Sequence, residues 1–226
     1  MLRVDFLSTI QLFKGLTDRE LEALSQSAIE RRYLPGQYLI DDSEPSERLF
    51  LIWEGRVKLT KSSFSGKEQT LQIYGPGDLV GLFSLFTGSS FPAAAIALSA
   101  CRALIFPRIL LERSAEKIPS LMVNLFYALA ARQSECIRTV GSLALKETPQ
   151  RLAAFLLLEL NKSNKKNEVT LGYSHRELAK IIGTSPETLS RVLSSFIHDG
   201  IIEQNGRSIS VLKRTLLENL EEGIDE

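Results

Sequence analysis

The pattern of apolar and polar positions divides the chain into stretches of different character. Leu21, Leu24 and Ala28 recur at helical spacing, and the capping-box pair Thr17 and Glu20 before them predicts a short N-terminal helix. Residues 33–106 instead form brief alternating segments separated by glycine turns, as antiparallel strands do. The continuous apolar runs at residues 50–53 and 93–98 predict strands that are buried on both faces or that face an interior cavity. We therefore expect an antiparallel barrel or roll here.

A single long helix is predicted next, from Pro119 to about Leu145. Apolar residues repeat along it at intervals of seven, which is the pattern of a narrow seam between paired helices. The expected dimer interface consists of residues on and beside this stripe: Met122, Leu125, Phe126, Leu129, Cys136 and Val140, with Leu143 continuing the repeat. The alternative is that the seam packs against the roll of its own chain.

Two short helices joined by a tight turn follow a further helix that begins near Thr148 and Pro149. Ser174 and Glu177 form a capping-box pattern, and Gly183 is expected to end the helix that begins there. Ser185 can cap the next helix, Pro186 suits its first turn, and apolar residues recur at helical spacing until Ile197. This arrangement is typical of a helix-turn-helix.

A hairpin is predicted directly after these helices. Asn205-Gly206 lies between two short segments, residues 201–204 and 207–211, and an Asn-Gly pair in that setting favours a two-residue β-turn. A helix-turn-helix followed by a hairpin is a winged helix-turn-helix, in which Arg207 near the hairpin tip can contact a DNA phosphate.

The outward face of the second helix carries hydrogen-bonding side chains. Arginine can pair with O6 and N7 of guanine, a carboxylate can accept from N4 of cytosine, and serine can bond to several bases. The expected DNA-binding residues are Ser185, Glu187, Thr188, Ser190, Arg191 and Arg207, with Ser194 on the same face. The alternative is that Glu187 and Arg191 form an ordinary exposed ion pair.

The net charge of zero gives no support for DNA binding, but the distribution of charge does. Residues 146–214 hold 11 basic and 7 acidic side chains, whereas the tail from residue 215 holds 5 acidic and no basic ones. Because the basic excess is small, affinity is expected to depend on dimerisation and base contacts as well as on phosphate neutralisation.

Length and composition are those of a globular protein with one large or two modest domains, since 44% of the 226 residues are hydrophobic. Two cysteines, Cys101 and Cys136, argue against a disulfide scaffold and favour a reducing compartment. Neither a signal-peptide core nor a long apolar run occurs, so we expect a cytoplasmic protein without a membrane partner. Phosphate-loop, metal-ligand and nucleophile motifs are absent from the sequence, which predicts neither an enzyme nor a metal site.

The order of these stretches resembles the cyclic-AMP receptor protein and fumarate-nitrate reduction regulator family of bacterial transcription factors. The likeness covers nearly the whole chain and rests on FKGLTDREL, LFLIWEGRVKL, GPGDLVGLFSLF and HRELAKIIGTSPETLSRVLSSFIHDGII. It implies an α+β fold with three parts: a double-stranded, cyclic-nucleotide-binding-like β-roll with an N-terminal helix (residues 1–118), a dimerisation helix (119–145) and a winged helix-turn-helix domain (146–226). It also implies double-stranded DNA, a second copy of the chain, RNA polymerase and an unknown small-molecule or redox effector as partners.

The resemblance also bears on what the protein recognises. The pattern Glu187-x-x-Ser190-Arg191 is similar to branches that sense oxygen and nitrogen oxides and read TTGA-type half-sites. Cyclic-nucleotide binders of the family carry Gly-Glu-Leu and Arg-Ser where this chain has Gly81-Leu82-Phe83 and Pro92-Ala93. Without the carboxylate for the ribose and the arginine for the phosphate, cyclic AMP is not expected. An iron-sulfur cluster is not expected either, because the family's clusters use N-terminal cysteines and the first cysteine of this chain is Cys101.

Haem stays open as a cofactor. His175 and His198 both lie in the DNA-binding segment, so haem iron would need Cys, Met, Tyr or a backbone group as its ligand. The candidate effector-pocket residues are Leu82, Phe83, Pro92, Ala93 and Cys136, although the apolar ones would equally fill the roll as core. Cys136 is either packing in the seam or a redox or ligand group, and Cys101 is assigned to the core.

We therefore expect a homodimeric, effector-controlled regulator that reads a palindromic TTGA-like DNA site. The alternative function is an interaction module in which the winged domain docks protein partners. Whether such a regulator activates or represses does not follow from its own residues.

Overall fold

The computed structural model describes residues 3–42, 46–66, 68–87, 90–162 and 167–224. The chain forms two compact units, of which the first lies within residues 1–136 and the second comprises residues 137–226 together with Glu68–Thr70. We call them the roll unit and the winged unit.

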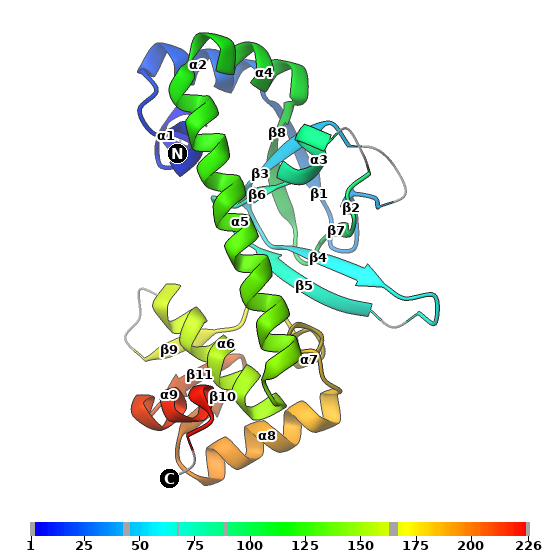
Figure 1. Cartoon of the computed structure of the whole chain (residues 1–226), viewed down its shortest axis with the longest axis vertical. Coiled ribbons are helices and arrows are strands. Elements are labelled where there is room, and N and C mark those ends of the chain that lie inside the picture. Colours follow the sequence, from blue (N-terminus) through cyan, green and yellow to red (C-terminus); the bar gives the residue numbers. More distant parts are fainter. Residues whose placement is uncertain (1–2, 43–45, 67, 88–89, 163–166, 225–226) are drawn as a thin grey trace. The chain divides into compact units, whose positions relative to one another are not determined.

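The roll unit combines a β-roll with several helices (Figure 1). Its helical segments are α1 (Arg3–Ser8), η1 (Gln11–Phe13), α2 (Asp18–Ser27), α3 (Leu82–Thr87), α4 (Arg108–Lys117) and the first part of α5 (Pro119–Leu145). Its strands are β1 (Ile29–Tyr33), β2 (Tyr38–Ile40), β3 (Arg48–Glu54), β4 (Val57–Ser62), β5 (Glu68–Tyr74), β6 (Leu79–Val80), β7 (Ala94–Ala97) and β8 (Cys101–Pro107). They form two four-stranded sheets, ordered β1-β8-β3-β6 and β2-β7-β4-β5.

Strand β3 confirms the prediction of a strand buried on both faces. Leu49 and Leu51 face the helices, whereas Phe50 and Ile52 face the interior of the roll, and all four side chains are at most 1% exposed. The interior cluster draws side chains from both sheets and contains Tyr33, Leu39, Ile40, Phe50, Ile52, Val57, Tyr74, Val80, Phe91, Ala93, Ala95, Ala97, Cys101, Ala103 and Ile105. The roll is therefore filled by its own side chains.

The helices cover one sheet of the roll. Thr17 and Glu20 form the predicted capping box, with the Glu20 carboxylate accepting from the backbone N–H of Thr17 at 2.7 Å. The apolar cluster between these helices and the sheet, which we call the helix-side cluster, contains residues from four helices. Helices α1, α2, α4 and α5 contribute Phe6, Leu7, Leu21, Leu24, Leu111, Leu121 and Leu125 to it. Helix α4 was not predicted, because β8 runs into it without the glycine break that marks other boundaries.

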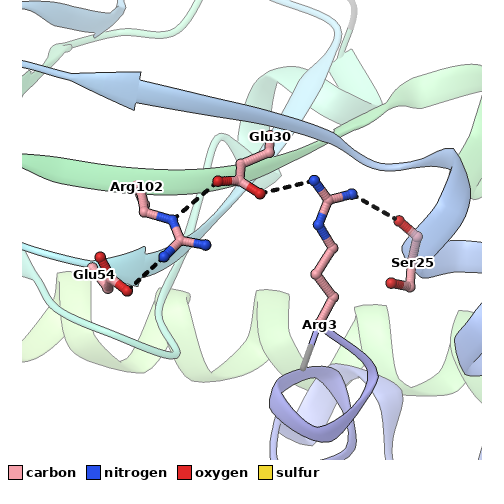
Figure 2. A network of polar contacts seen from close by, with 5 residues as sticks. All are labelled: Arg3, Ser25, Glu30, Glu54 and Arg102. Atoms are coloured by element: carbon pink, nitrogen blue, oxygen red, sulfur yellow. Dashed lines mark hydrogen bonds and ion pairs between the residues drawn. The ribbon is translucent and has the colours of Figure 1, made fainter. Parts of the chain in front are cut away.

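A polar network fastens α1 to the roll (Figure 2). Glu30 on β1 accepts from Arg3 at 2.8 Å and from Arg102 at 3.1 Å, and Arg102 also donates to Glu54 at 2.8 Å. The Arg102 guanidinium lies 4.1 Å from the centroid of the Trp53 ring, which stacks on Phe6 at 5.5 Å. Charged and aromatic contacts thus hold α1, β1, β3 and β8 together.

The winged unit contains the last turns of α5, α6 (Thr148–Lys162), α7 (His175–Ile182), α8 (Pro186–His198) and α9 (Arg214–Glu222). Its three-stranded sheet has the order β10-β11-β9, formed by β9 (Glu168–Thr170), β10 (Ile202–Asn205) and β11 (Ser208–Val211). The helix-turn-helix and the hairpin are present as predicted (Figure 1), whereas β9 and α9 were not anticipated.

The division between the units falls within α5, between Cys136 and Ile137, and so differs from the boundary that the sequence suggests near Lys146. The reason is local packing. Leu143 lies so close to the helix-turn-helix that a Cβ added to Gly183 would be 2.8 Å from its Cδ2 atom. The last turns of α5 consequently belong with the winged unit.

Candidate DNA interface and effector region

Helix α8 is positioned by a short turn, residues 183–185, between two well-capped helices. Gly183 ends α7 in the left-handed conformation, with φ 74°, and its N–H donates to the carbonyl of Ala179. The Ser185 hydroxyl caps α8 by accepting from the backbone N–H of Thr188 at 3.1 Å. Leu189, Leu193 and Phe196 then anchor α8 in the core of the unit.

The opposite face of α8 is exposed. Glu187, Ser190, Arg191 and Ser194 all lie on it, as the helical spacing predicts. Within the described chain, Glu187 and Arg191 do not form an ion pair, and the Arg191 Nη2 atom donates to Thr188 Oγ1 at 3.2 Å. Both charged groups are exposed on this face, where another molecule can reach them.

Ser185 and Thr188 support this face through their hydroxyl groups. The two hydroxyls lie 3.1 Å apart within hydrogen-bonding distance, and Thr188 in turn accepts from Arg191. The chain of bonds runs along one side of α8 from its first turn to the guanidinium group. Ser185 and Thr188 thus hold Arg191 in place and do not simply project from the helix.

Glu187 remains ionised at neutral pH. A hydrogen bond from its own backbone N–H, a second from the Ser185 side chain, and the charges of Arg176 and Arg191 lower its pKa from the ordinary value. An ionised carboxylate at this exposed position is a hydrogen-bond acceptor that suits an amino group on a base edge.

The wing places Arg207 at the tip of the hairpin, but the turn differs from the prediction by one residue. Asn205 pairs with Ser208 as the last rung of the sheet, so the loop consists of Gly206 and Arg207. Gly206 has φ 60°, and a positive φ at the first loop position is the conformation that glycine supplies in two-residue hairpins. Arg207 is exposed there.

Helix α5 carries an uncovered apolar face. Leu121 and Leu125 are its buried residues, and Leu125 is only 2% exposed in the helix-side cluster of its own chain. Its own chain therefore already covers the side chain of Leu125, and a place for it in a dimer interface stays a prediction. Phe126 and Val140, by contrast, are 64% and 60% exposed.

The remaining residues of the predicted seam differ in how far their own chain covers them. Met122 is 36% exposed, Leu129 packs partly against the helix-side cluster, and Leu143 packs beside Gly183. Cys136 is exposed. The stripe that points fully outward lies one position away and consists of Val123, Phe126, Ala130, Gln133, Ile137, Val140 and Ala144, which alternate at spacings of three and four.

The candidate effector residues do not gather at one place. Leu82 lies in the helix-side cluster and Ala93 in the roll interior, whereas Pro92 and Phe83 are exposed. The Phe83 ring meets the edge of Phe91, with centroids 6.2 Å apart. Cys101 is buried as predicted, and burial raises the pKa of its thiol to about 11.

One polar group facing the roll was missed from the sequence. Arg132 of α5 donates to Glu135 at 2.5 Å and to the carbonyl of Leu79 at 3.2 Å, and its guanidinium lies 4.5 Å from the centroid of the Tyr74 ring. An arginine on a helix otherwise reads as a solvent-exposed charge, and nothing in the spacing shows that it points into the roll unit.

Comparisons with known proteins match both units. Residues 30–117 fit the family profile of a cyclic nucleotide-binding domain, and residues 150–220 fit that of a Crp-like helix-turn-helix domain. The cyclic AMP receptor protein of Thermus thermophilus is 31% identical over 218 residues, which cover 94% of this chain and 97% of that protein. The chain belongs to the cyclic-AMP receptor protein and fumarate-nitrate reduction regulator family.

Two further relatives support the same assignment. The CRP-like cAMP-activated global transcriptional regulator of Mycobacterium tuberculosis is 26% identical over 211 residues, covering 92% of this chain and 94% of that protein. The solved structure of FixK2 from Bradyrhizobium japonicum matches with a TM-score of 0.79 and 27% identity, over 86% of this chain and 97% of that one.

Membership of this family makes the chain a DNA-binding transcription regulator, in agreement with the sequence-based prediction, and not an enzyme. None of the described helices combines the length and apolar character needed to cross a membrane. Nor, within the described ranges, do three His, Cys, Asp or Glu side chains gather where they could hold a metal ion.

Proposed function

We propose that the protein is a cytoplasmic homodimer that binds two-fold symmetric DNA through α8 under the control of an effector sensed by the roll unit. The observation that carries the proposal is the exposed face of α8, where ionised Glu187 and the Thr188-supported Arg191 flank Ser190 without pairing to each other. These groups match the donor and acceptor pattern of a G·C pair in the major groove.

The family pattern around Glu187, Ser190 and Arg191 favours TTGA-like half-sites. Arg207 at the wing tip and Arg176 on α7 are exposed basic groups of the same unit, suited to phosphate contacts. Arg191 therefore supplies specificity in this proposal, and Arg207 supplies affinity that does not depend on sequence.

The outward stripe of α5 is the proposed dimer seam. Its positions recur as the a and d positions of a heptad, and Val123, Phe126, Ile137 and Val140 are each at least 50% exposed in the single chain. A parallel pair of such helices buries these side chains and brings two copies of α8 to one face of a DNA duplex. Cys136 then lies beside the seam and not on the two-fold axis, so we do not expect a disulfide between its copies.

Cyclic AMP does not fit the residues of the roll. The Thermus relative is named for this nucleotide, but here Leu82 is 4% exposed in an apolar cluster and Ala93 is 1% exposed in the roll interior. Neither side chain can pair with a ribose hydroxyl or a phosphate, and a phosphate diester without partners would be costly to bury.

The effector class stays open between a hydrophobic molecule such as haem and a redox signal. Mass spectrometry and an absorption spectrum of the protein as purified would reveal a retained haem or metabolite. RNA polymerase is the further partner that the proposal requires, since the relatives are regulators of transcription.

DNA titration tests the proposal directly. We expect tight binding to a palindromic TTGA-containing duplex and weaker binding to a scrambled duplex of equal length. Arg207→Ala should weaken both and lower the salt slope by about 1, whereas Arg191→Ala should weaken the palindrome alone, by about 1 to 3 kcal/mol. Equal binding to both duplexes by the wild type would favour the alternative, an interaction module with a winged domain that docks proteins.

A further inference from the structure

Arg151, on the first turns of α6, bonds to three separate parts of the winged unit. Its Nε atom donates to the carbonyl of Ile182 at 2.8 Å, and Nη1 donates to the carbonyl of Lys146 at 2.5 Å. Nη2 donates to Thr148 Oγ1 at 3.2 Å and lies 3.5 Å from the carbonyl oxygen of Gly183. Each of the three guanidinium nitrogens thus has a partner inside the winged unit.

The backbone carbonyl groups that accept from Arg151 lie at the ends of helices. Ile182 and Gly183 close α7 at the turn before α8, and Lys146 follows the last residue of α5. Helix ends leave carbonyl groups without intrahelical partners, and a guanidinium satisfies several of them at once. Arg151 therefore joins the end of the α5 helix to the turn that precedes α8, the helix proposed to read DNA.

Two other contacts hold the end of α5 against the rest of the winged unit. Leu143 packs against Gly183, where a Cβ would be 2.8 Å from Leu143 Cδ2, and the Lys146 ammonium pairs with Glu221 of α9 at 2.9 Å. The outward residues Ile137, Val140 and Ala144 lie on this same part of α5, inside the winged unit.

We propose that Arg151 is a positioning residue that fixes α8 relative to the C-terminal end of α5. Arg151 would thereby set the spacing between half-sites that the dimer accepts. The inference rests on the proposed function. If the seam fixes two copies of α5, then Arg151 fixes each copy of α8 to its own α5. A palindrome whose half-sites lie one helical turn of DNA apart requires the two copies of α8 to be about 34 Å apart.

A binding series with altered spacing tests this role. Duplexes carry the selected palindrome, the same palindrome with one or two base pairs inserted at its centre, or one half-site alone. Inserting two base pairs shifts and rotates the second half-site, so the wild type should lose about 30-fold or more in affinity. Arg151→Gln should lose less than about threefold for the same insertion, with half-site affinity within about threefold of wild type.

Arg151→Lys gives a second variant that retains the charge but can reach fewer carbonyl groups, and intermediate spacing selectivity is expected for it. Arg214→Gln is the matched control, because Arg214 bonds to Glu218 and Asn161 on the surface of the same unit. It should keep the spacing selectivity of the wild type.

The outcomes separate the two claims. A wild type that binds the palindrome no better than one half-site refutes the proposed function itself. If the Arg151 variants lose as much affinity as the wild type when base pairs are inserted, the proposed role of Arg151 is overturned. Uniform weakening on every duplex, with the spacing preference retained, also overturns it, because that is what simple destabilisation produces.

Discussion

At the scale of single residues, the two cysteines lie in different surroundings. Cys101 is buried in β8 and its thiol pKa is raised to about 11, whereas Cys136 is exposed on α5. The thiolate is the reactive form, so Cys101 should be inert at neutral pH. We predict that a thiol reagent labels the native protein once, at Cys136, and labels Cys136→Ser only after unfolding. Rapid labelling of two sites in the native protein, counted by mass spectrometry, would contradict this.

Glu30 illustrates how a charged residue contributes to stability. The hydrogen bond from Arg3, aided by the charge of Arg102, lowers the pKa of Glu30 from its ordinary value. Because the folded-state pKa is the lower one, the stabilisation is present at neutral pH and is lost as the pH falls through that value. Glu30→Gln should lower the free energy of unfolding at pH 7 by about 1 kcal/mol, and the difference should narrow below about pH 4.

Urea unfolding across pH measures this difference. Glu112→Gln is the control, because Glu112 pairs with Arg108 on an exposed helix surface and such pairs contribute little. A Glu30→Gln deficit that stays constant down to acid pH would show that the carboxylate charge is not the cause.

At the scale of elements, the structure shows which sequence signals carry over. Capping at Thr17 and Ser185 and the glycine at position 183 are local signals, and each marks a helix boundary that the structure confirms. The register of the proposed α5 seam could not be obtained from local signals of this kind. Which stripe faces outward depends on which one the roll covers, and the burial of Leu125 is a tertiary fact.

The seam itself provides the next prediction. Ile137→Glu should give monomers, because two copies of the carboxylate would face each other across the seam without a partner. Ala131→Glu introduces the same residue at an exposed position off the stripe and should remain dimeric. Sedimentation at micromolar concentration distinguishes these results. A monomeric wild type, or a dimeric Ile137→Glu, would refute the proposed seam.

At the scale of the whole molecule, the overall order of roll, long helix and winged helix-turn-helix was predictable because its motifs are local and occur together. The candidate site was predictable only in part. The exposed face of α8 follows from helical spacing. The hydrogen bonds of Arg151, in contrast, join the carbonyl groups of residues 146, 182 and 183, and no periodicity of the sequence indicates that these lie together. Arg132 was missed for the same reason.

The composition of the roll leads to a prediction about ligands. Titration calorimetry with cyclic AMP or cyclic GMP should give no binding heat, because Leu82 and Pro92, which stand where cyclic-nucleotide binders carry glutamate and arginine, supply neither a carboxylate nor a guanidinium group. Micromolar binding of either nucleotide would mean that other groups of the roll hold the phosphate.

The central claim is that exposed residues of α8 read symmetric DNA, and selection of binding sites from random duplexes tests it most directly. The wild type should recover a palindrome with TTGA-like half-sites. Arg191→Ala should recover a palindrome in which one G·C position per half-site has become degenerate, a loss of about 1 to 3 kcal/mol of discrimination. Recovery of no palindrome, or of the same palindrome by both proteins, would contradict the account.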